Sequence, residues 1–97
     1  MNIQAMMAQA RKLQKEIEKT TSEIDNTEYE ISNENIQIIC YGNYKVKKID
    51  IKDTSILEDK EMLEDIIVVA MNEVLKKIET DKTKKLGKYT NGLGGLF

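Results

Sequence analysis

Basic side chains at helical spacing are the residues of this 97-residue chain that are best suited to chemistry with a partner. Lys12, Lys15 and Lys19 follow one another at intervals of three and four, which places side chains on one ridge of a helix. Their ammonium groups could bind anionic groups such as phosphates through charge and hydrogen bonds. The simpler interpretation, which charge alone favours, is an ordinary solvated helix face.

Residue types that usually carry catalysis or bind metals are scarce. There is no histidine, so the commonest general base and metal ligand is missing. Cys40 is the single cysteine and lies in an apolar stretch, which fits a buried core residue better than a reactive thiol. The acidic residues from Asp59 to Asp65 fit helix capping and solvation better than a site for a hard cation. We therefore predict no enzyme activity, no metal site and no cofactor.

The net charge of −2 conceals a segregation of charge along the chain. Residues 1–22 carry +2, residues 35–52 carry +3 and residues 66–97 carry +3, whereas residues 23–34 and 53–65 each carry −5. Local patches, rather than the net charge, set what each surface can bind. No apolar run is long enough to span a membrane, and the N-terminus lacks the layout of a signal peptide. These features predict a cytoplasmic protein.

The longest predicted element is a helix in residues 55–85, with a short helical lead-in. Its apolar residues recur three or four apart, and Ile66 to Met71 is apolar without a break. A strand at Ile66 to Val69 is the alternative, but strong helix formers flank it and no turn residue interrupts it. We expect Ser55 and Asp59 to cap the start and Gly87 to end the helix. A helix that is apolar nearly all round must be covered on more than one side, which predicts packing against the sheet and a second copy.

The remainder of the chain predicts a second helix and a small antiparallel sheet. Residues 2–24 carry an apolar seam at heptad spacing, opposite the lysine ridge. Three strands are expected at residues 27–32, 36–41 and 44–51, with a type II′ turn at Gly42-Asn43 and a bulge near Lys47-Lys48. Asn33-Glu34 forms the other turn. We predict one domain over residues 1–87 and a flexible tail at residues 88–97.

Several stretches of the sequence are distinctive: the start M-N-I-Q-A-M-M-A-Q-A-R-K-L-Q, the hairpin with G-N at its turn, K-V-K-K-I-D-I, L-E-D-K-E-M-L-E-D-I-I-V-V-A-M-N-E-V-L-K-K and the close G-L-G-G-L-F. Together they resemble the YbaB/EbfC family of bacterial nucleoid-associated proteins. The resemblance covers nearly the whole chain in order. The turn before the second strand departs from the family because it contains no glycine. The acidic net charge suggests modest affinity for DNA.

The resemblance implies an α+β fold in which α-β-β-β-α subunits with a three-stranded antiparallel sheet form a homodimer in the cytoplasm or nucleoid that binds double-stranded DNA. The protein would influence nucleoid organisation and gene expression. Its basic helix faces would supply the contacts to DNA phosphates. The expected DNA contacts are Arg11, Lys12, Lys15, Lys19, Lys76, Lys77, Lys82, Lys84 and Lys85. The expected dimer interface contains Ile39, Tyr41, Ile66, Val69, Ala70, Met71 and Val74. The alternative is a small dimeric adaptor that binds a DNA replication or recombination protein through its acidic blocks.

Overall fold

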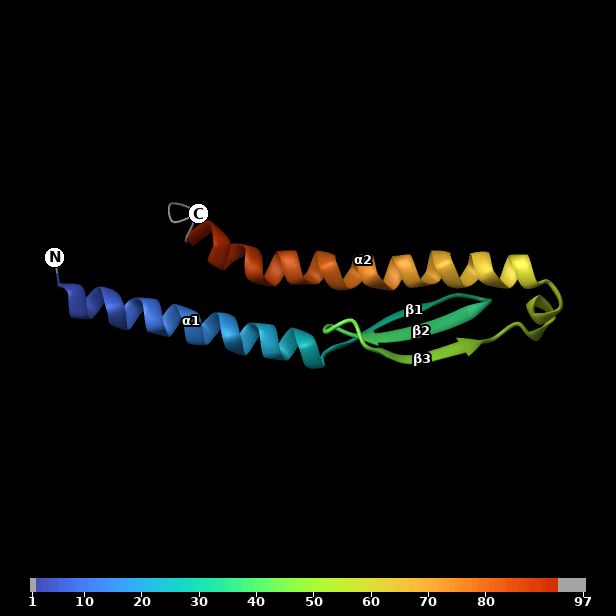
Figure 1. The fold of residues 1–97 in the computed structure, drawn as a ribbon, viewed down its shortest axis with the longest axis horizontal. Helices are drawn as coiled ribbons and strands as arrows, with labels where there is room; N and C mark the ends of the chain where they lie inside the picture. The colour runs from blue at the N-terminus through green and yellow to red at the C-terminus, as the bar shows by residue number, and fades with distance from the viewer. Residues whose placement is uncertain (1, 93–97) are drawn as a thin grey trace.

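A computed structural model describes residues 2–92, with side chains through Tyr89, and contains two long helices and one sheet (Figure 1). In chain order the elements are α1 (Ile3–Asn26), β1 (Glu28–Ser32), β2 (Ile36–Tyr41), β3 (Val46–Ile51), the short 3₁₀ helix η1 (Thr54–Glu58) and α2 (Lys60–Gly92). This order confirms the predicted α-β-β-β-α subunit. The helical assignment of the apolar run in α2 is also confirmed, because the strong helix formers around it outweigh its β-branched residues.

The core lies between the sheet and α2. The strands are antiparallel in the order β1-β2-β3, so β2 is central. Ile36, Ile38 and Cys40 alternate along β2 and are all 0% exposed, because they face α2. Burial raises the pKa of the Cys40 thiol. Helix α2 packs on β1 and β2 and leaves the same face of β3 half-exposed at Val46 and Ile49.

The hairpin between β2 and β3 differs from the predicted type II′ turn. The amide of Tyr44 donates to the carbonyl of Tyr41 at 2.9 Å, and Tyr44 itself has a φ of 69°. The loop therefore has three residues, with a left-handed residue at its end. Gly42 is needed for a different reason: a Cβ there would lie 1.9 Å from the carbonyl oxygen of Ile24. The predicted bulge is confirmed, because Lys47 is the extra residue between two register pairs.

Helix α1 runs past its predicted end at residue 24 and stops at Asn26. The Asn2 side chain accepts a hydrogen bond from the Gln4 amide at 3.0 Å and caps the start of the helix. The seam of α1 is covered unevenly: Ile24 is 1% exposed beside the hairpin, whereas Ile3 is 70% exposed at the far end. The chain therefore fills only one end of the seam with its own residues.

The ends of α2 follow the sequence signals only in part. Asp53, and not Ser55, caps η1, while Asp59 caps α2 through its bond from the Met62 amide as predicted. The predicted end at Gly87 is wrong, because the helix continues through Gly92. Tyr89 lies within hydrogen-bond distance of Thr20, 3.3 Å between the two hydroxyl oxygens, so this last part packs along α1. Residues 93–97 of the predicted tail lie outside the described residues.

The subunit is elongated, with principal extents of 69 × 22 × 16 Å. Figure 1 shows α2 running over the sheet and then back along α1, whose N-terminal half projects away from the sheet. We call the three strands with the Lys60 to Asp81 part of α2 the body, and we call α1 the arm. Within the described residues, neither helix is long and apolar enough to cross a membrane.

Candidate nucleic-acid interface

The arm carries four cationic side chains that face solvent. Arg11, Lys12, Lys15 and Lys19 are all exposed, and they lie on the side of α1 away from the apolar seam. None of the ion pairs found within residues 2–89 involves these four. Their charge is therefore directed outward, which is the state that a polyanion can use.

The lysines of α2 that were expected to contact DNA behave differently, because three of them have partners inside the subunit. The ammonium group of Lys77 donates a hydrogen bond to the carbonyl oxygen of Glu30 at 3.0 Å. Lys82 stacks over the ring of Tyr44, 4.3 Å from its centroid. The Lys85 ammonium lies 2.9 Å from a carboxylate oxygen of Asp81. These lysines join α2 to its surroundings and to itself, so the structure separates them from the lysines of the arm.

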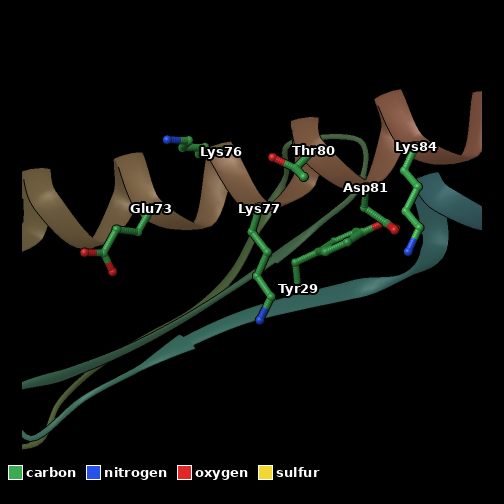
Figure 2. Close-up of a pocket in the computed structure, with 7 residues that line it drawn as sticks. All are labelled: Tyr29, Glu73, Lys76, Lys77, Thr80, Asp81 and Lys84. Carbon is green, nitrogen blue, oxygen red and sulfur yellow. The ribbon is translucent and has the colours of Figure 1, made fainter. Parts of the chain in front are cut away.

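Lys76 and Lys84, the other two, line a cavity between α2 and β1 (Figure 2). Its volume is about 530 Å³. The residues around it are Tyr29, Glu73, Lys76, Lys77, Thr80, Asp81 and Lys84. Sequence reasoning did not find this cavity, because its floor comes from Tyr29, which is more than 40 residues away from α2 along the chain.

A partly buried hydrogen bond joins two of the residues that line the cavity. The hydroxyl of Tyr29, which is 6% exposed, donates to Asp81 at 2.5 Å. Burial, followed by the bond to Asp81, raises the pKa of Tyr29 to about 12. The same bond, together with the one from Lys85, lowers the pKa of Asp81. Asp81 follows Val74 and Ile78 on the side of α2 that faces the sheet. An acidic residue at such an inward position is the sequence feature that could have indicated a buried hydrogen-bond partner.

The residues expected at a dimer interface fall into four environments. Ala70 and Val74 are 2% and 0% exposed and belong to the subunit's own core. Val69 is 58% exposed on α2, whereas Ile66 and Met71 are half-buried at the margin of the core. The last two residues, Ile39 and Tyr41, are half-buried on the outer face of the sheet, where Ile39 lies between Glu30 and Lys48.

Comparison with known proteins identifies the family. The model of the YbaB/EbfC DNA-binding family matches residues 1–93 of this chain. A nucleoid-associated protein of Enterococcus faecalis is 36% identical, with 98% of this chain and 94% of that protein covered. One of Lactococcus lactis is 40% identical, with 96% and 97% covered. An uncharacterised Helicobacter pylori protein has a similar fold, with a TM-score of 0.69 and 19% identity over 87% of this chain and 91% of that one. Sequence, fold and exposed basic helix agree, and the chain belongs to the YbaB/EbfC DNA-binding family.

Proposed function

We propose that this protein binds double-stranded DNA in the nucleoid as a homodimer, mainly through phosphate contacts from the arm. The observation that carries the proposal is the row of exposed cations at Arg11, Lys12, Lys15 and Lys19, for which the described residues offer no ion-pair partner. Family membership and the nucleoid-associated relatives support the choice of DNA as the polyanion. Contacts of this kind read charge and not sequence, so the expected role is in nucleoid organisation and, through it, gene expression.

Helix α2 is expected to contribute less to DNA contacts than α1, because Lys77, Lys82 and Lys85 already have partners inside the subunit. A lysine that already binds a carbonyl, a ring or a carboxylate would have to exchange that contact for a phosphate. Its charge still adds to the attractive field around the subunit, but its loss would remove no direct phosphate contact. We therefore place the phosphate contacts on α1 first.

The homodimer is supported by apolar side chains that the single chain leaves exposed. Val68 on α2 is 57% exposed, and Val46 and Ile49 on β3 are 50% and 46% exposed on the same side of the body. The free end of the arm adds Ile3 and Met6, at 70% and 50%. A second copy that covers these surfaces would bury them and place two basic arms in one particle.

The test of DNA binding compares two triple substitutions that remove the same charge. One replaces Lys12, Lys15 and Lys19 by Gln, and the other replaces Lys77, Lys82 and Lys85 by Gln. Fluorescence anisotropy with a labelled duplex, over a series of salt concentrations, gives the slope of log affinity against log salt. With about four to six phosphate contacts per dimer, the wild-type slope should be roughly −3.5 to −5.5.

The arm triple should make this slope shallower by more than about one unit and weaken binding to all duplexes alike. The α2 triple should change the slope less and lower the stability of the fold instead. If the α2 triple abolishes binding and the arm triple does nothing, the arm is only a packing element. If wild type gives no binding even at low salt, DNA is the wrong partner.

The homodimer is tested by sedimentation at micromolar concentration. Wild type should sediment as a dimer, and Val68→Asp should shift it toward a folded monomer, because the charge would be buried only in the assembly. Val68 is mostly exposed in the single chain, so the fold itself should survive. A folded wild-type monomer at these concentrations contradicts the proposal.

A further inference from the structure

Strand β1 is an edge strand whose outward backbone groups have no strand beside them in the described part of the chain. The carbonyl of Thr27 accepts from the Gly42 amide, and the Asn33 amide donates to the carbonyl of Ile36, both at 3.0 Å. Odd-numbered residues of this stretch therefore bond toward β2, and the alternation of an antiparallel ladder turns Glu28, Glu30 and Ser32 outward. The bond from Lys77 to the Glu30 carbonyl agrees with this assignment.

Two cavities lie between this edge and α2, and we call the strip of surface that contains them the groove. At the start of β1 is the cavity of about 530 Å³ beside Tyr29. Figure 2 shows Lys77, Asp81 and Lys84 extending from α2 toward β1 at this point. Where β1 ends, a second cavity of about 250 Å³ is lined by Asn33, Asn35, Asp65, Ile66, Val69 and Ala70. A strand added beside β1 would pass both cavities.

The two cavities differ in chemistry. In the first cavity, the Asp81 carboxylate already binds Tyr29 and Lys85. The other charged residues that line it are three lysines and one acid, Glu73, so the cavity is cationic. In the second, Ile66, Val69 and Ala70 supply an apolar wall. The groove is therefore cationic at one end and mainly apolar at the other, which fits a ligand with carboxylates at one end and an apolar side chain at the other.

A second copy of β1 is a poor occupant of this edge. Antiparallel pairing of two full β1 strands, centred on Glu30, would place Glu30 opposite its own copy. Pairing centred on Tyr29 would place Glu28 opposite Glu30. Like charges directly opposite each other destabilise a strand pair, so the edge disfavours these pairings with itself and suits a different chain.

We propose that this groove binds an extended acidic peptide of another protein, which adds to the sheet beside β1. Between the centres of the two cavities α2 advances by about eleven residues, or about 16 Å at 1.5 Å per residue. An extended chain covers that length in about five residues, so one short peptide segment can reach both cavities. On binding, Lys77 exchanges the Glu30 carbonyl for a carboxylate of the peptide. This function goes beyond DNA binding and uses the opposite side of α2 from the proposed dimer surface.

The probes are labelled eight-residue peptides with alternating β-branched residues, an Ile at one end and Glu residues about four to six positions away, synthesised in both orders. A matched peptide carries Lys in place of Glu. Anisotropy should show binding of a Glu peptide and at least tenfold weaker binding of the Lys peptide. Lys77→Glu with Lys84→Glu should weaken the Glu peptide at least tenfold. Lys82→Glu makes one of the same charge changes on the far side of α2 and should have little effect.

Backbone pairing has its own readout. Glu30→Pro removes an outward amide without touching the ladder to β2, and it should abolish peptide binding. If that variant does not fold, hydrogen exchange on wild type decides, because bound peptide should protect the Glu30 amide. Peptide binding without this protection would be mere charge attraction and would overturn the proposal. The proposal would also fail if wild type were a dimer and Val69→Glu were a folded monomer, because the groove would then belong to a second copy.

Discussion

The body and the arm contain the same kinds of side chain but treat them differently. In the body, Ile36, Ile38 and Val74 are fully buried, and Lys77 binds a backbone carbonyl of β1. In the arm, Ile3 is 70% exposed and the lysine ridge has no ion-pair partner within the described residues. Lysines at helical spacing occur in both regions, so spacing alone does not determine their role.

The difference is set by what faces each helix. Where α2 lies over the edge of the sheet, the long side chain of Lys77 reaches the Glu30 carbonyl of β1, and its hydrogen bond stabilises the fold. Where α1 projects past the sheet, a lysine side chain meets only water. We therefore expect substitutions in the body to change stability and substitutions in the arm to change binding. The following four predictions test that separation.

Gly42→Ala should have the largest effect on stability, because it acts where the arm joins the body. The added Cβ would lie 1.9 Å from the carbonyl oxygen of Ile24, and backbone cannot move aside as a flexible side chain would. We expect a loss of about 3 kcal/mol or more in the free energy of unfolding, measured by urea denaturation. A loss below about 1 kcal/mol would show that the arm is not seated on the hairpin as described.

Tyr29→Phe should have an intermediate effect, because it removes the hydrogen bond that ties β1 to α2. A bond to a charged acceptor is worth about 1.5–3 kcal/mol, so unfolding near pH 7 should become easier by roughly that amount. Phosphate contacts from the arm should be unaffected in the folded fraction. DNA affinity that falls while the fold remains intact would contradict the separation.

The same variant gives a signature in alkali. The pKa of Tyr29 is raised from 10.0 to about 12 in the folded protein, so folding favours its protonated form. Its contribution is fully present below about pH 10 and is lost as pH rises through about 12. The stability difference between wild type and Tyr29→Phe should shrink over this window. An unchanged difference up to pH 12 would mean that the hydroxyl does not bond to Asp81.

Gly87→Ala should have the smallest effect, and its sign should be opposite to that of Gly42→Ala. A Cβ at Gly87 meets nothing within 4 Å, and the residue lies inside α2. Removing glycine flexibility from a helix interior stabilises by about 0.5–1 kcal/mol. Thermal unfolding should therefore shift upward, and a downward shift would indicate a bend in the helix at this position.

The sequence predicted the fold well because each element carried its own periodicity. The alternation of Ile36, Ile38 and Cys40, and the slip near Lys47, led directly to the observed sheet. Prediction from the sequence failed where contacts between distant residues determine the local structure. Gly42 was interpreted as a turn glycine, but its conformation is ordinary and the constraint comes from Ile24. Gly87 was expected to end a helix that continues, because packing against α1 supports further turns.

The candidate site was predictable only as a set of cations. The ridge on α1 follows from spacing, and its exposure follows from lying opposite the seam. The partners of Lys77 and Lys82 come from β1 and the hairpin, which are distant in sequence. No local pattern in α2 distinguishes a lysine that binds a carbonyl from one that faces a partner.

The continuity of α2 through both regions has a mechanical consequence. Its 33 residues form a rigid helix of about 50 Å that packs on the sheet and continues beside α1. The contact between Thr20 and Tyr89 attaches the arm to this helix. A force that bends the arm away from α2 must therefore break this packing, and does not act only on the backbone at Thr27. In the proposed homodimer, two such subunits would hold their arms at a set spacing, and a bound duplex would have to fit the gap between them.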